Sequence, residues 1–321
     1  MPEQDLPPGR HRLLKEHLMT EIRMAEQTPA TEADDRGRRP WRRPSLVAAA
    51  VAAVAAVTFT VVPASDGRTG SRPATTAAVL LEDLALAAEH EEARDEVRDD
   101  QYTYVETKVA WTGARKGGPT TTVPLHRHET WIAVDGKRKS LTRDAVEGER
   151  ELPGEPQPGD HLADWSSSYN HLKTLPTDPD AMYDWLRRMS QQGFMTAAVG
   201  STWYPVEEPE QAMLLAAGTV LEDTLLPPAQ SAALYRAVAR IPGVTVDEDA
   251  VDVLGRHAVA IARQGRKIPA RVEWFFDSET HEFLGRRSVA TEDSGGLKKG
   301  TVTYDSAVVR RAVVDKAGER P

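Results

Sequence analysis

Hydrophobic and polar positions alternate with several different periods along this chain, and each change of period marks a new element. Leu14, Leu18 and Ile22 recur every four residues, with charged side chains between them. This spacing predicts a short amphipathic helix over residues 11–27, whose apolar stripe is suited to dock on a cytoplasmic protein or to lie on a membrane surface. A frayed tail with accidental periodicity is the alternative, because so short a helix is marginal in water.

An uncharged stretch follows. The 17 residues from Leu46 to Val62 include seven alanines and six valines. As a helix they span about 26 Å, close to the roughly 30 Å thickness of a bilayer's hydrocarbon core. We therefore expect a transmembrane helix over residues 45–65. The other interpretation is an alanine-rich buried helix of a soluble domain, but no charged residue interrupts the run.

Basic residues predict the orientation of this helix. Four arginines stand just before it, at Arg38, Arg39, Arg42 and Arg43. Because cytoplasmic flanks are rich in Lys and Arg, residues 1–44 are expected in the cytoplasm as a tail with a basic spacer, and the rest of the chain outside. A cleaved export signal ending near Ala64 is the rival hypothesis, although 44 residues make an unusually long charged region for one.

Beyond the linker expected over residues 66–75, periodicity predicts one extracytoplasmic domain over 76–316. Its patterns occur in this order: a helix after residue 76, strands over 101–112 and 126–142, a polar loop over 147–160, three proline-entered helices over 175–241, and strands over 243–315. Asp135-Gly136 marks a hairpin turn. Strands, then helices, then strands indicate an α+β fold with a curved antiparallel sheet packed on helices.

Composition removes several classes of function. The chain of 321 residues has no cysteine, which excludes disulfides, thiolate catalysis and cysteine-ligated metals. Its net charge is −9, and the basic cluster adjoins the apolar run, so we expect no nucleic-acid partner. Neither a Walker loop nor a G-x-G-x-x-G pattern occurs.

Candidate chemistry is sparse. His126 and His128 project from one face of a predicted strand, but the sequence identifies no third metal ligand. The serine-rich stretch over 160–171 lacks a nucleophile elbow. We therefore expect no catalytic, metal or cofactor residues and no enzyme; a secreted hydrolase stays the least supported hypothesis. Trp111, Trp131 and Trp274 are candidates for the wall of an apolar cleft, with core packing as the plainer alternative.

Two resemblances add to this picture. The segment VEWFFDSETHEFLGRR is similar to a hairpin of LolA/RseB-like periplasmic domains, which implies a curved sheet over helices with an apolar cleft. Four segments together with the apolar helix resemble a family of actinobacterial single-pass membrane proteins: RHRLLKEHLMTEI, VRDDQYTYVETKV, LPTDPDAMYDWL and LYRAVARIPGVTVDEDAVDVLGRHAVAI. That family has no assigned activity and is often encoded near extracytoplasmic-function sigma factors, which implies an anti-sigma-like or accessory role. The tail lacks the His-x3-Cys-x2-Cys of zinc anti-sigma domains.

The sequence thus favours a non-enzymatic, membrane-anchored sensor or accessory protein. Its expected partners are the lipid bilayer, a cytoplasmic protein such as a sigma factor, and a hydrophobic ligand, with no cofactor. An exported carrier of lipids or other hydrophobic molecules with a cleaved signal is the alternative.

Overall fold

The computed structural model describes most of the predicted outer domain. The described ranges are 76–91, 97–114, 119–155, 166–191, 194–196, 202–204 and 208–321. The amphipathic helix, the four arginines and the transmembrane helix predicted before residue 66 lie outside these ranges. Within them, no helix combines the length and the apolar character needed to cross a bilayer. The chain divides into two units, and the account below concerns the second, residues 68–321.

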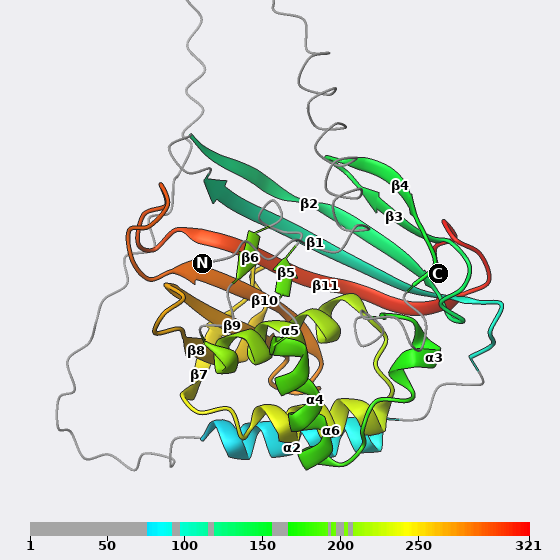
Figure 1. The fold of residues 1–321 in the computed structure, drawn as a ribbon, viewed down its shortest axis with the longest axis horizontal. Helices are drawn as coiled ribbons and strands as arrows, with labels where there is room; N and C mark the ends of the chain where they lie inside the picture. The colour runs from blue at the N-terminus through cyan, green and yellow to red at the C-terminus, as the bar shows by residue number, and fades with distance from the viewer. Residues whose placement is uncertain are drawn as a thin grey trace, which may run out of the picture. The chain divides into compact units, whose positions relative to one another are not determined.

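A curved sheet of nine antiparallel strands dominates this unit, in the order β4-β3-β2-β1-β11-β10-β9-β8-β7 (Figure 1). Its strands are β1 (Tyr102–Ala114), β2 (Thr120–Ala133), β3 (Ser140–Asp144), β4 (Gly148–Leu152), β7 (Val244–Val251), β8 (His257–Gln264), β9 (Ala270–Phe276), β10 (Phe283–Ala290) and β11 (Val302–Val314). Two further strands, β5 (Phe194–Thr196) and β6 (Thr202–Tyr204), pair with each other.

Helices lie on one side of this sheet (Figure 1). They are α2 (Ala77–His90), the single turn α3 (Tyr169–Leu172), α4 (Pro179–Gln191), α5 (Pro209–Asp223) and α6 (Pro228–Val238). α2 packs along α6, while α5 contacts β9 and β10. The expected α+β class with a curved antiparallel sheet on helices is therefore confirmed for this unit.

Local signals explain where these helices begin. α4, α5 and α6 each start at a proline, a residue tolerated at the first helical position because its missing N–H needs no partner there. The Asp178 carboxylate accepts hydrogen bonds from the backbone N–H groups of Asp180 and Ala181 and so caps α4. Thr76 caps α2 through the N–H of Val79, at 3.3 Å.

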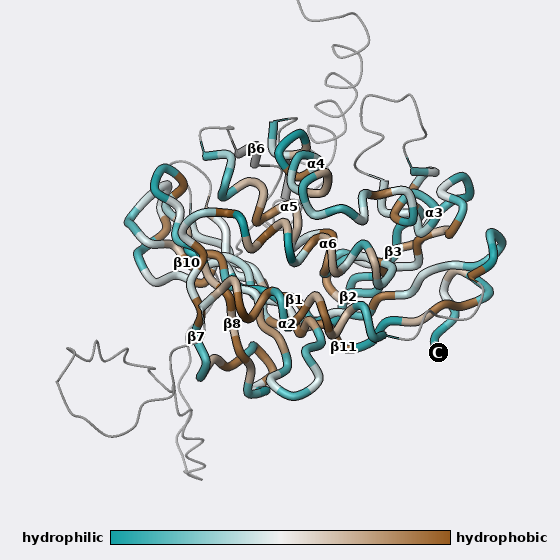
Figure 2. The backbone as a smooth tube through the Cα atoms, turned by 90° about the horizontal axis from the view of Figure 1, so that it is seen from below, coloured by the Kyte–Doolittle hydropathy of each residue, from teal (hydrophilic) through white to brown (hydrophobic). Residues whose placement is uncertain are grey.

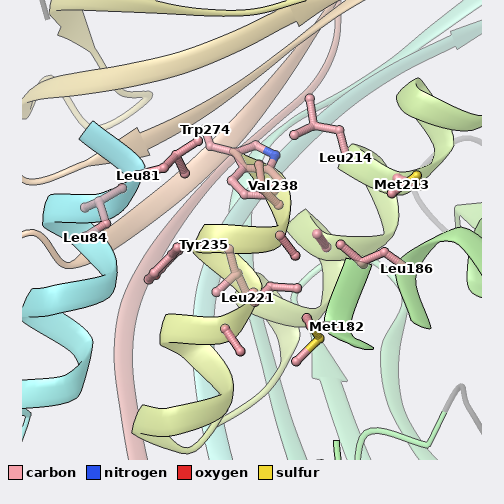
Figure 3. Close-up of a cluster of buried hydrophobic side chains, with 14 of the residues drawn as sticks. Leu81, Leu84, Met182, Leu186, Met213, Leu214, Leu221, Tyr235, Val238 and Trp274 are labelled. Carbon is pink, nitrogen blue, oxygen red and sulfur yellow. The ribbon is translucent and has the colours of Figure 1, made fainter. Parts of the chain in front are cut away.

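The main core lies between the helices and strands β8 to β11. Figure 2 shows hydrophobic stretches along α2, α5 and α6 and hydrophilic loops around them. Trp274 of β9 is fully buried between Leu81 of α2 and Leu214 of α5 (Figure 3). A Cβ at Gly218 would lie 2.7 Å from Trp274 Nε1, so the close approach of α5 to β9 requires glycine at this position.

Long-range pairing joins the two ends of the domain. β11 is hydrogen-bonded to β1 on one side and β10 on the other, with Tyr102 opposite Val314. After β11 the chain folds back over β2, where Arg320 makes two hydrogen bonds of 2.6 Å to the buried Glu129 carboxylate. The indole N–H of Trp131 donates to the carbonyl of Glu319 at 2.5 Å. The last residues are thus part of the folded domain.

One expectation about the fold was wrong. Residues 148–152 were expected within a polar loop, but they form β4 at the edge of the sheet, paired with β3. Their side chains are mostly charged and exposed, so they carry no apolar alternation. The strand forms because the Asp144 carboxylate accepts hydrogen bonds from the N–H groups of Val146 and Glu147 and closes a tight turn. Charged edge strands also resist pairing with other chains.

Candidate ligand-binding cavity

A cavity of about 620 Å³ lies between the helices and the sheet. Its walls come from α2, the end of α5, α6, the turn between β9 and β10, and β11. Polar and charged side chains make up about half of the lining. The apolar residues that contribute to it are Leu84, Ala87, Ala88, Leu221, Leu225, Leu226, Phe283, Leu284, Val308 and Val309. We call this space the α5–β10 cavity. Its volume falls within the range of small-molecule sites, which is roughly 300–1,000 Å³.

Separation of β10 from β11 creates the floor of the cavity. The two strands pair from Arg287 to Val289 in β10, but not at Leu284. There the guanidinium of Arg256 donates to the carbonyls of Leu284 at 2.9 Å and Val308 at 3.2 Å. Arg256 is itself held by the fully buried Asp252 carboxylate, with Nε 2.6 Å from Oδ2. The strands therefore diverge without leaving these buried carbonyls unsatisfied.

Next to this point the strands approach very closely. Gly285 has φ 146°, and a Cβ there would lie 2.2 Å from the carbonyl oxygen of Ser306. Only glycine fits this backbone conformation and this contact. Gly285 therefore sets the position from which β10 and β11 separate toward the cavity.

A buried ionic cluster fixes the end of α5 beside the cavity. Glu222 is completely buried, and its carboxylate accepts a hydrogen bond from Arg286 Nε and another of 2.5 Å from the Tyr304 hydroxyl. The Arg286 guanidinium also stacks over the Tyr304 ring at 4.6 Å. A buried carboxylate is tolerated only when it is paired in this way. The cluster joins α5 to β10 and β11 and so holds Leu221 and Leu225 in the wall.

Tyr235 is a buried polar residue in the lining of the cavity. It is 6% exposed, and its ring packs edge-on against Phe276, with centroids 5.8 Å apart. Burial raises the pKa of the Tyr235 hydroxyl above its ordinary value, so the group stays protonated. Figure 3 shows Tyr235 on the side of α6 that faces α2.

Arg311 brings positive charge to the same wall. Its guanidinium donates to the carbonyl of Leu221 at 2.5 Å and lies 5.9 Å from the centre of the Phe283 ring. These contacts hold the cation on the side of β11 that faces the end of α5. The cavity thus combines apolar side chains with hydroxyl and charged groups, Tyr235 and Arg311 among them.

The rim carries one strained residue. His281, in the turn between β9 and β10, has φ 63° and is the sole non-glycine residue with positive φ among those described. Asp277 holds the turn by accepting hydrogen bonds from the N–H groups of Glu279 and Thr280. Such strain occurs often at binding sites, because the surrounding structure maintains it.

The three candidate cleft tryptophans lie apart from one another. Trp274 is in the main core, and Trp131 is in a separate cluster on the other half of the sheet, 5.1 Å from the Tyr104 ring. Trp111 is half-buried on β1 opposite Tyr304. None of the three belongs to the residues that line the α5–β10 cavity. Leu14, Leu18 and Ile22, predicted to bind a partner, lie outside the described residues.

His126 and His128 meet a common carboxylate. His126 Nε2 and His128 Nδ1 are each 3.0 Å from Asp144 Oδ2. These distances are those of hydrogen bonds, and the described residues contain no group of three His, Asp or Glu side chains arranged to hold a metal ion. The histidines therefore tie β2 to the end of β3.

Sequence reasoning missed the residues that line the cavity. Leu84 was recognised as part of an apolar helical stripe, but nothing distinguished it from core residues. Tyr235 offered a signal, since it is the lone aromatic residue in the alanine-rich helix PAQSAALYRAV. A tyrosine at an inward position brings a hydroxyl that must be satisfied.

Comparison of the sequence with known proteins identifies no relative. The chain matches no protein-family model, and no curated protein is significantly similar to it in sequence.

Proposed function

We propose that this protein is a membrane-anchored sensor or accessory protein whose outer domain binds a hydrophobic ligand in the α5–β10 cavity. The observation that carries the proposal is the cavity itself: about 620 Å³ of space, lined by leucines, valines and phenylalanine together with polar and charged side chains. Protein interiors are close-packed, so a space of this size closes unless the surrounding structure maintains it.

Three features of the fold support the view that the α5–β10 cavity is kept open. Arg256 keeps β10 and β11 apart, Gly285 sets the point of separation, and Glu222 holds the end of α5. Each uses a buried charge or a strained backbone, which costs stability in the absence of a compensating role. The cavity is therefore better understood as a binding site than as a packing defect.

Ligand binding also suits a signalling role. α2 supplies one wall of the cavity and directly follows the linker predicted over residues 66–75, next to the predicted transmembrane helix. A ligand that contacts Leu84 would act on the helix that is nearest in sequence to the predicted membrane anchor. The predicted tail helix, through Leu14, Leu18 and Ile22, would then report to a cytoplasmic partner.

The test is photolabelling of the full chain in lipid nanodiscs with a diazirine-bearing dodecanol, followed by peptide mapping. We expect labelled peptides from the end of α5 and from β10, and loss of that labelling in Val309→Trp, which narrows the cavity. Val302→Trp is the matched control, because both valines are exposed on β11 but only Val309 lines the cavity. Labelling restricted to residues 46–62, or unaffected by Val309→Trp, would contradict the proposal.

An exported carrier would use the same cavity, so the two hypotheses differ only in the fate of the amino-terminal segment. Mass spectrometry of the mature protein separates them. A start at Met1 or Pro2 supports the anchored form, and a start near Ser65 supports the carrier.

A further inference from the structure

We propose that one face of strands β1 to β3 is a binding site for an extended peptide with the sequence Gly-x-Arg. Residues 315–321 of this chain, which we call the strap, occupy the site until such a segment of another protein displaces them. The inference is independent of the α5–β10 cavity, because the strap crosses the other face of the sheet.

Two adjacent arginines of β11 show which face the strap covers. Arg311 donates to the carbonyl of Leu221 in α5, so its side chain lies on the face that carries the helices. Arg310 donates to the carbonyl of Pro321 at 2.9 Å. Since neighbouring side chains of a strand project from opposite faces, the strap lies on the face away from the helices.

The site beneath the strap is deeply buried and is built by the sheet. Glu129 is 1% exposed, and Tyr104 and Trp131 are fully buried. The Tyr104 hydroxyl donates to the Glu129 carboxylate at 2.7 Å, and the Arg143 guanidinium stacks over the Trp131 ring at 5.0 Å. These side chains come from β1, β2 and β3, so the sheet itself positions the groups that contact the strap.

Arginine is the specific element of the bound sequence. Arg320 donates two hydrogen bonds of 2.6 Å to the two oxygens of Glu129. This paired geometry suits a planar guanidinium and not the single ammonium of lysine. Without Arg320, the carboxylate would keep the Tyr104 hydroxyl and a longer contact of 3.4 Å from Arg127. The buried charge therefore favours an arginine at this position.

The remaining contacts involve the backbone of the strap. The Trp131 indole N–H donates to the carbonyl of Glu319, and Arg310 donates to that of Pro321. Neither contact requires a particular side chain in the peptide. Gly318 has φ 85°, a conformation that favours glycine. The site thus recognises an arginine between two backbone carbonyls, with a glycine two positions before it.

The strap is loosely held compared with the site that it covers. All its residues are exposed except Gly318, which is half-buried. At its start, Asp315 accepts hydrogen bonds of 2.9 Å from Arg98 and Gln101, and exposed polar contacts of this kind contribute less than about 1 kcal/mol. A tethered segment nevertheless competes at an effective concentration that is roughly millimolar for short linkers. The strap is therefore suited to act as an internal competitor of an external peptide.

The experiment is fluorescence anisotropy with a labelled peptide of residues 315–321, DKAGERP, titrated with the full chain in nanodiscs. Arg320→Gln in the chain loosens its own strap and leaves the site unchanged. We expect this variant to bind the peptide at least about tenfold more tightly than the wild type does, because the strap loses two charge-assisted hydrogen bonds. Asp315→Ala loosens the strap at an exposed position away from the site, and it should raise the affinity about threefold.

The matched control is the same peptide carrying Arg320→Gln, which should bind at least about tenfold more weakly to both variants. Absence of binding to both variants, equal affinities of the two peptides, or equal affinities of the wild type and the variants would overturn the inference. A wild-type dimer that excess peptide dissociates would assign the site to the strap of a second copy, and so would also overturn the assignment to another protein.

Discussion

Asp305 offers a sharp test of the electrostatics of the sheet. It lies on β11, it is 8% exposed, and its Oδ2 accepts a hydrogen bond of 2.9 Å from Arg287 Nε. Its second carboxylate oxygen is buried and has no hydrogen-bond partner. Burial raises the pKa of Asp305 from 3.8 to about 6; Arg287 opposes the rise, and Asp252 and Glu273 add to it. The native state therefore disfavours the ionised form.

The size of the effect follows from this pKa. A rise from 3.8 to about 6 means that ionisation of Asp305 costs the native state about 3 kcal/mol, at about 1.4 kcal/mol for each pH unit. Because the folded pKa lies above the unfolded one, the native state holds an extra proton between pH 4 and 6. The contribution of Asp305 to stability is thus greatest below about pH 4 and declines as pH rises to about 6.

Asp305→Asn removes the charge but keeps an oxygen that accepts from Arg287. We expect the variant to be more stable than the wild type by about 1 to 3 kcal/mol at pH 7.5, and the difference to vanish near pH 4. The assay is equilibrium urea unfolding of the full chain at several pH values, followed by tryptophan fluorescence. Asp249→Asn, at an exposed position on β7, is the control. A destabilised Asp305→Asn at pH 7.5, or a pH-independent difference, would refute the reasoning.

Two further substitutions test the packing that shapes the domain. Gly285→Ala should lower the free energy of unfolding by about 3 kcal/mol, because its Cβ would lie 2.2 Å from the Ser306 carbonyl oxygen. Gly255 also has positive φ but lies in open space, so Gly255→Ala should lower the free energy of unfolding by about 1 kcal/mol. Equal effects of the two substitutions in urea unfolding would contradict this account. Arg320→Gln should lower the melting temperature, since two hydrogen bonds from Arg320 and one from Tyr104 hold the pKa of Glu129 below its ordinary value despite its burial. Combining it with Glu129→Gln should recover part of the loss, and no recovery would argue against the pairing.

Much of the secondary structure was predictable because its signals are local. Prolines marked the starts of α4, α5 and α6, and Gly136 adopts the positive φ expected of a hairpin turn at Asp135-Gly136. The Asp135 carboxylate also accepts hydrogen bonds from the backbone N–H groups of Lys137 and Arg138, as is typical of turn aspartates. Fold class followed from the order of these elements.

The features that shape the cavity depend on contacts distant in sequence. Arg256 reaches β10 and β11, which follow it by 28 and 52 residues. No periodicity reveals that Gly285 faces Ser306, or that the chain after β11 returns to Glu129. For the same reason, tryptophan content did not identify the cavity: Trp131 and Trp274 fill the cores, and the leucines that line the space look like any others in the sequence. The transmembrane helix and its orientation stay predictions.

The central claim is that the α5–β10 cavity holds a ligand. The most direct measurement is an isotope-edited NMR experiment on methyl-labelled full-length protein in nanodiscs with dodecanoate. We predict intermolecular nuclear Overhauser effects from the alkyl chain to the methyl groups of Leu84, Leu225 and Val308. At saturating dodecanoate, effects restricted to exposed methyl groups such as those of Val146 and Val251, or none at all, would contradict the account.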